Sequence, residues 1–70
     1  MSEGFGIEQQ IASVEREIAM RERAYPRWVE QRRMTAKTAA REIACMKAVL
    51  ATLRRVASED QGERASAVES

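Results

Sequence analysis

Apolar residues in the first part of the chain recur at alternating spacings of four and three. The positions are Ile7, Ile11, Val14, Ile18, Tyr25 and Trp28, and the same spacing also includes one charged residue, Arg21. On a helix these positions form one stripe along one face, and the flanking residues are mostly Glu, Gln and Arg. The pattern predicts an amphipathic helix that begins at Ile7, with Gly6 as its N-cap and Glu8 favourably placed in the first turn.

Pro26 lies inside this stripe. Proline removes the backbone N–H that would bond the carbonyl of Glu22, at a cost of about 3 kcal/mol in a helix interior. The stripe nevertheless stays in phase through Tyr25 and Trp28. We therefore expect one helix over about 7–31 with a kink at Pro26. The alternative is a break, with Pro26 opening a short separate helix.

A second helix is predicted over about 35–57. Residues 31–34 are expected to form the turn, and Thr35 is a favourable N-cap. The same alternation then returns at Ala36, Ala39, Ile43, Met46, Leu50, Leu53 and Ala57. Residues 1–6 are expected to be a flexible tail, and 58–70 a frayed or disordered one. The expected fold is all-α: an antiparallel, coiled-coil-like two-helix hairpin over 7–57.

The second helix carries a further apolar stripe, displaced by roughly 110° from the first at about 100° per residue. It consists of Cys45, Val49, Thr52 and Val56. Because one partner helix does not need so wide an apolar arc, we expect these residues to form an oligomer interface. The simplest arrangement is a homodimer that makes a four-helix bundle. Alternatively, a different protein binds this stripe, or the tails fold back and bury it within the same chain.

Arg21 is the charged member of the first stripe. An unpaired arginine in a helix seam is costly. We expect its guanidinium to leave the seam and meet Glu42 or Glu17. The alternative is a role in register selection or partner contact.

The composition excludes several classes of function. The chain has 70 residues, no His and one Cys. It therefore has too few ligands for a zinc site and no histidine for acid–base or triad chemistry. We expect no enzyme, metal, cofactor or small-molecule substrate. The lone Cys45 fits the cytoplasm, and no apolar run approaches the roughly 20 residues of a membrane span.

Charge is distributed unevenly. Residues 1–20 have one base and four acids (−3), residues 21–47 eight bases and three acids (+5), and residues 48–70 three bases and four acids (−1). The total of +1 therefore conceals a basic hairpin tip. The candidate binding residues there are Arg21, Arg23, Tyr25, Arg27, Trp28, Arg32, Arg33 and Lys37. Such a cluster suits a protein-binding hot spot, or phosphate contact with base stacking. Alternatively, the aromatic rings only close the end of the bundle.

Two segments of the tip carry a resemblance. Tyr25-Pro26-Arg27-Trp28-Val29, followed by Arg33-Met34-Thr35, resembles a family of small uncharacterised phage and prophage proteins, over about residues 7–54. Members often have Gly where this chain has Arg32, which would give an easier helix C-cap. The resemblance implies that the chain is encoded by a phage or prophage gene. It implies no catalytic residue and no cofactor.

The expected function is therefore non-enzymatic. Small phage proteins of this size commonly inhibit or redirect a host protein. Together with the aromatic and basic residues of the tip and the wide apolar arc of the second helix, this favours a dimeric hairpin whose tip engages a phage or host protein in the host cytoplasm. One alternative is a nucleic-acid-binding accessory protein of phage replication or recombination, which the net charge of only +1 disfavours. Another is a structural part of a virion.

Overall fold

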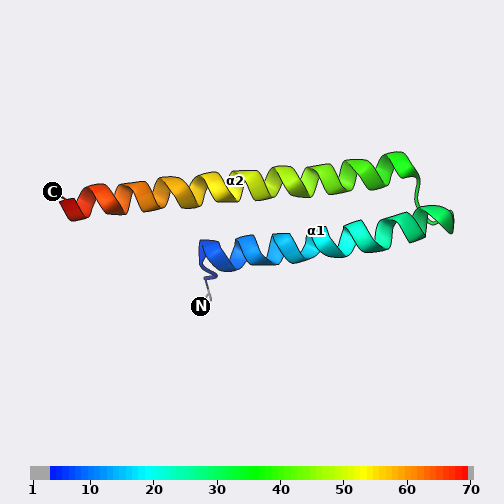
Figure 1. Ribbon diagram of the computed structural model, residues 1–70, viewed down its shortest axis with the longest axis horizontal. Helices are drawn as coiled ribbons and strands as arrows, with labels where there is room; N and C mark the ends of the chain where they lie inside the picture. The colour runs from blue at the N-terminus through cyan, green and yellow to red at the C-terminus, as the bar shows by residue number, and fades with distance from the viewer. Residues whose placement is uncertain (1–3, 70) are drawn as a thin grey trace.

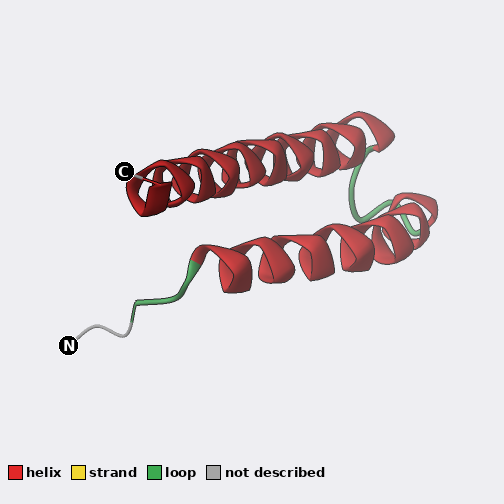
Figure 2. Cartoon of the chain, turned by 60° about the vertical axis from the view of Figure 1, so that its left-hand side comes forward, coloured by secondary structure: helices red, strands yellow, loops and turns green. Residues whose placement is uncertain are grey.

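The computed structural model describes the backbone of residues 4–69 and the side chains of residues 4–59. It contains two helices, α1 (Ile7–Glu30) and α2 (Ala36–Glu69). They run antiparallel side by side, joined by residues 31–35 (Figures 1 and 2). Over the described part of the chain there is no strand. The predicted all-α hairpin is confirmed.

The molecule is elongated. Its extents are 58 × 26 × 16 Å and its radius of gyration is 16.7 Å. A compact domain of this length would have a radius of gyration of about 11 Å. Because α1 has 24 residues and α2 has 34, α2 projects past the start of α1 (Figure 1). The two helices therefore share one seam, and much of each helix surface faces solvent.

Side chains of the first turn fix the start of α1. Gly6 is the N-cap, in extended conformation with φ −64° and ψ 159°. Its N–H donates to Oε1 of Gln9 at 3.0 Å, and the side-chain amide of Gln10 donates to the carbonyl of Phe5 at 2.9 Å. Part of the expected tail 1–6 is thus held against the helix, while residues 1–3 lie outside the described residues.

Pro26 lies inside α1 without ending it. Its side chain is exposed, so it stands on the solvent side of the helix. On that side the carbonyl of Glu22, which lacks its helical donor, can bond water instead. The prediction of one helix through Pro26 is confirmed, and the alternative of a separate short helix is wrong. The kink at Pro26 stays a prediction.

The turn is a Schellman C-cap built without glycine. Arg32 has φ 62°, in the left-handed region, and its N–H donates to the carbonyl of Val29 at 3.0 Å. The N–H of Arg33 donates to the carbonyl of Trp28 at 2.8 Å. These are the two hydrogen bonds of the Schellman motif, with Arg32 in the place that glycine usually fills.

Thr35 caps α2 as expected, because its Oγ1 accepts a hydrogen bond from the N–H of Thr38 at 3.1 Å. The far end differs from the expectation. The helix continues to Glu69, where we expected it to end near residue 57 and a frayed or disordered tail to follow. Residues 58–69 contain no proline and include several Glu and Ala residues that favour a helix; Gly62 is the residue that opposes its continuation most. Ser70 lies outside the described residues.

The core is small and follows the predicted seam. Its buried residues are Ile18, Tyr25, Ala39 and Leu50. The other predicted seam residues are half-buried, except for Ala36, which is exposed next to the turn. This is the expected result for two helices that meet along a single line.

The two edges of the seam differ. On one edge, Glu15 pairs with Arg54 at 2.6 Å and Glu22 pairs with Lys47 at 3.2 Å. The two acids are seven residues apart on α1, and the two bases are seven residues apart on α2. Because seven residues make two helical turns, both pairs lie on the same side of the seam. We call this side the ion-pair edge. Heptad position places Glu42, Val49 and Val56 of α2 on the opposite side.

Candidate binding surfaces

The two aromatic residues of the tip are packed together. Tyr25 is only 8% exposed, and its ring centroid lies 5.4 Å from that of Trp28, with 33° between the planes. Trp28 is half-buried, and the guanidinium carbon of Arg33 lies 5.4 Å from its ring centroid. Both rings therefore close the end of the hairpin, and Tyr25 presents little surface to a partner.

Arg21 also turns inward. Its Nε donates to the carboxylate of Glu17 at 2.8 Å, while Nη1 donates to the carbonyl of Glu42 at 3.2 Å and lies 3.6 Å from that residue's carboxylate. Its side chain is 18% exposed, and its guanidinium carbon lies 5.8 Å from the ring centroid of Tyr25. The hydrogen bond with Glu17 raises the pKa of Arg21 above its ordinary value. The expected contacts of Arg21 with Glu17 and Glu42 are confirmed, and through them Arg21 connects the two helices.

The remaining candidate residues of the tip are all exposed. They are Arg23, Arg27, Arg32, Arg33 and Lys37, which we call the basic tip. None of them takes part in the four ion pairs found within the described part of the chain. The arginines and lysine along the seam, by contrast, are paired with acids. The basic tip thus presents five cationic groups to solvent.

The candidate interface on α2 is exposed along its whole length. Cys45, Val49, Thr52 and Val56 are all exposed, and the exposed fractions of Val49 and Val56 are 40% and 44%. Within the described residues, no segment of the chain folds back over them. The alternative of an intramolecular cover by the tails therefore finds no support.

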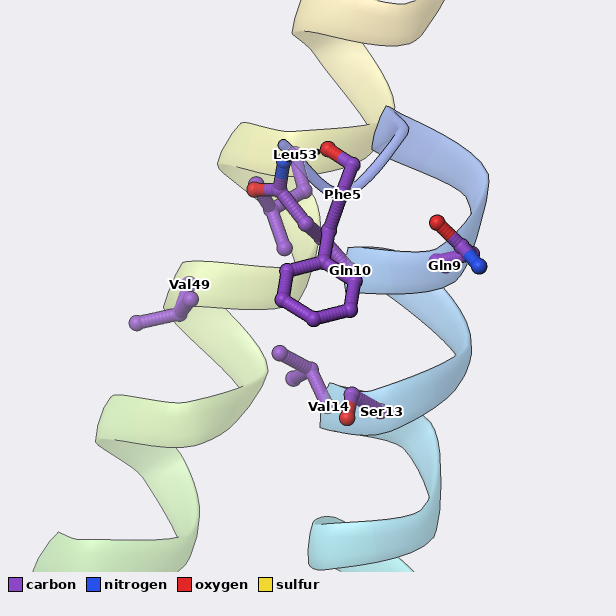
Figure 3. A pocket seen from close by; sticks show the side chains of 7 residues that line it. All are labelled: Phe5, Gln9, Gln10, Ser13, Val14, Val49 and Leu53. Atoms are coloured by element: carbon purple, nitrogen blue, oxygen red, sulfur yellow. Dashed lines mark hydrogen bonds between the residues drawn. The ribbon is translucent and has the colours of Figure 1, made fainter. Parts of the chain in front are cut away.

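An apolar groove lies beside this stripe, between the first turns of α1 and the middle of α2 (Figure 3). Its volume is about 410 Å³. It is lined by Phe5, Gln9, Gln10, Ser13, Val14, Val49 and Leu53. Polar groups in this lining come from two glutamines and one serine, and none of them is a titratable group. The groove is therefore suited to contact with an apolar side chain rather than to chemistry.

Sequence reasoning missed Phe5. Its side chain is 70% exposed and forms part of the groove wall, although the segment around it was expected to be only a tail. The available signal was its position directly before the N-cap, where an apolar residue often packs back onto the first turn of a helix. Here Gln10 holds it there through the Phe5 carbonyl.

Among the residues that the structure describes, no three acidic or cysteine side chains gather as metal ligands would. Within the same residues, neither helix has an apolar stretch long enough to cross a membrane. Comparison with known proteins gives no match: no protein-family model, no curated protein and no solved structure is significantly similar to the chain.

Proposed function

We propose that this chain is a small phage-type protein that acts by binding, without catalysis, and that its basic tip engages an acidic surface of a phage or host protein. An inhibitor or modulator of that protein is the role that fits best. The observation that carries the proposal is the contrast between the exposed, unpaired cations of the tip and the paired cations of the seam.

The geometry of the tip supports recognition of a folded surface. The cap hydrogen bonds hold the backbone of Arg32 and Arg33 against the end of α1. Exposed charges contribute mainly to the choice of partner and to the rate of association, because each exposed ion pair adds only a modest free energy of binding. A phage protein that must find one host protein quickly would benefit from this arrangement.

Nucleic acid is the second candidate for the same tip. Five exposed cations could contact phosphates. Base stacking, however, would need a free aromatic face, and Trp28 already has Tyr25 and Arg33 beside its ring. This packing favours a protein partner over single-stranded nucleic acid.

A capture experiment tests the proposal. The full chain would be immobilised and exposed to lysates of bacteria, with and without nuclease treatment. The double variant Arg27→Glu/Lys37→Glu changes two exposed tip cations, and Arg16→Glu/Arg55→Glu is a control with the same charge change away from the tip. Circular dichroism would verify that both variants are helical.

We expect a nuclease-resistant protein partner that the tip variant loses and the control retains. Equal capture by the tip variant would contradict the proposal. Capture that nuclease abolishes, together with steeply salt-dependent binding of labelled DNA, would instead establish the nucleic-acid alternative, because phosphate contacts release counterions.

A further inference from the structure

Phe5 stands between two hollows at the open end of the hairpin. One is the apolar groove of about 410 Å³, which Phe5 lines together with residues of both helices (Figure 3). The other has a volume of about 330 Å³ and involves only Phe5 and α1. It is lined by Phe5, Gln9, Ala12, Ser13 and Arg16. Because Phe5 is 70% exposed, its ring borders both hollows without filling either of them.

The apolar groove has room for this ring. A cavity of about 150 Å³ is enough to bind benzene, and the groove is larger than that. On the α2 side it is lined by Val49 and Leu53, and Val49 is itself 40% exposed. A ring that turned into the groove would therefore bury apolar surface on both sides of the contact, which is favourable in water. The second hollow includes an arginine, a glutamine and a serine, so it offers the ring less apolar contact.

The backbone on both sides of Phe5 permits such a movement. Gly4 and Gly6 flank it, and neither has a positive φ. A Cβ at Gly4 would have no neighbour within 4 Å, and a Cβ at Gly6 would meet only Oε1 of Gln9, at 3.9 Å. The conformation of this segment therefore does not require glycine at either position. What the two glycines add is a wider range of backbone conformations around Phe5.

Two hydrogen bonds keep the segment beside the groove. The side-chain amide of Gln10 donates to the carbonyl of Phe5 at 2.9 Å, and the N–H of Gly6 donates to Oε1 of Gln9 at 3.0 Å. Both bonds involve the backbone of the segment, so they leave the side-chain torsions of Phe5 free. The ring can thus turn toward α2 while the segment stays attached to the first turn of α1.

We propose that residues 4–6 form a strap that closes the apolar groove, with the ring of Phe5 turning inward onto Val49 and Leu53 of α2. The open strap leaves the groove accessible to an apolar molecule or side chain, whereas the closed strap excludes it. Closure also adds an apolar contact between the start of α1 and the middle of α2. This device lies away from the basic tip and does not depend on what the tip binds.

A fluorine label on Phe5 tests this inference in the full chain. Phe5 is the only phenylalanine, so incorporation of para-fluorophenylalanine labels this ring alone. The difference in fluorine chemical shift between light and heavy water reports how far water reaches the ring. A strap that stays open should give about 70% of the difference measured in the urea-unfolded chain, in line with its exposure. We expect about half of that difference or less, because the closed ring is shielded from water.

Two matched variants show whether the groove is what shields the ring. Val49→Gln makes the α2 side of the groove polar and should return the shift difference to the value of the open strap. Val56→Gln is the same change one heptad further along, at a similarly exposed site outside the groove, and should leave the native value unchanged. A native value equal to that of the open strap, or an equal response to the two variants, would overturn the inference.

A neutral apolar dye distinguishes a strap from a fixed wall. N-phenylnaphthylamine becomes fluorescent in apolar surroundings, and Phe5→Ala removes a ring that is mostly exposed, so the helices should be retained. If the ring closes the groove, this variant should bind the dye severalfold more strongly than the native chain. Met20→Ala removes another exposed apolar side chain, outside the groove, and should bind the dye as the native chain does. Unchanged or weaker binding by Phe5→Ala would mean that the ring is only a wall of the groove and would overturn the inference.

Discussion

Arg33 and Trp28 make two contacts with each other, one through the backbone and one through the side chains. The N–H of Arg33 donates to the carbonyl of Trp28 at 2.8 Å, and its guanidinium carbon lies 5.4 Å from the centre of the Trp28 ring. In a Schellman cap these two positions usually make a hydrophobic contact. Here a cation–π contact takes its place, so a residue of the basic tip also stabilises the end of α1.

Replacing Arg33 by alanine should therefore destabilise the hairpin by about 0.5–1 kcal/mol, the range for a cation–π contact at an exposed site. Urea unfolding followed by circular dichroism, at one fixed protein concentration, would measure the loss. The emission of Trp28 should shift as well, because the ring gains contact with water. Arg27→Ala, another exposed arginine of the tip, is the control and should change neither signal by a comparable amount.

Replacing Arg32 by glycine should stabilise the protein by about 0.5–1 kcal/mol. The left-handed conformation at φ 62° disfavours a side chain by roughly 1–2 kcal/mol, and glycine avoids this cost while adding some entropy to the unfolded chain. Arg32→Ala separates conformation from charge, since it removes the cation and retains Cβ. If alanine stabilised as much as glycine, relief of charge repulsion at the tip would be the cause instead.

Replacing Thr35 by alanine should cost about 1 kcal/mol, because the N–H of Thr38 then loses its acceptor at the start of α2. Thr35→Ser keeps a hydroxyl and should retain most of the stability. Thermal unfolding of the three proteins at equal concentration would compare them. Equal stability of the alanine and serine variants would mean that the cap contributes nothing measurable.

The ion pair of Glu15 with Arg54 should contribute little. Its partners are about half exposed, and exposed pairs contribute about 0.2–1 kcal/mol. A double-mutant cycle with Glu15→Gln and Arg54→Gln would measure the coupling, which should shrink as salt is added. A coupling well above 1 kcal/mol that is insensitive to salt would show that the ion-pair edge is a main source of stability.

The periodicity of the chain was sufficient to predict the two helices and their seam. Ile18, Tyr25 and Leu50 are buried where the alternation of four and three placed them. The path through Pro26 was also predictable, since the apolar stripe kept its phase on both sides. Fold class follows from such patterns because an amphipathic helix has few ways to bury its apolar face.

Features that depend on distant or unusual contacts were harder to predict. The apolar pattern did not indicate that Arg32 would adopt a left-handed conformation, which favours glycine; the one signal was the Gly that the resemblance led us to expect at this position. The end of α2 was misjudged because the polar composition after residue 57 was read as a tail, although it is compatible with a helix. The pairing of Glu15 with Arg54 requires the antiparallel register, which becomes known only when both helices are placed.

The short connection between the helices has a kinetic consequence. Only residues 31–35 separate α1 from α2, and both the cap at Arg32 and the cap at Thr35 are made by neighbouring residues. Closing so short a loop costs little chain entropy, whereas contacts at the open end join residues about 40 positions apart, as Glu15 and Arg54 are. We therefore expect the contacts between the helices to form first next to the turn and then successively toward the open end of the hairpin. Amide hydrogens near Ile18 and Tyr25 should exchange more slowly than those of Ile11 and Val14, which lie within the same helix but nearer its open end.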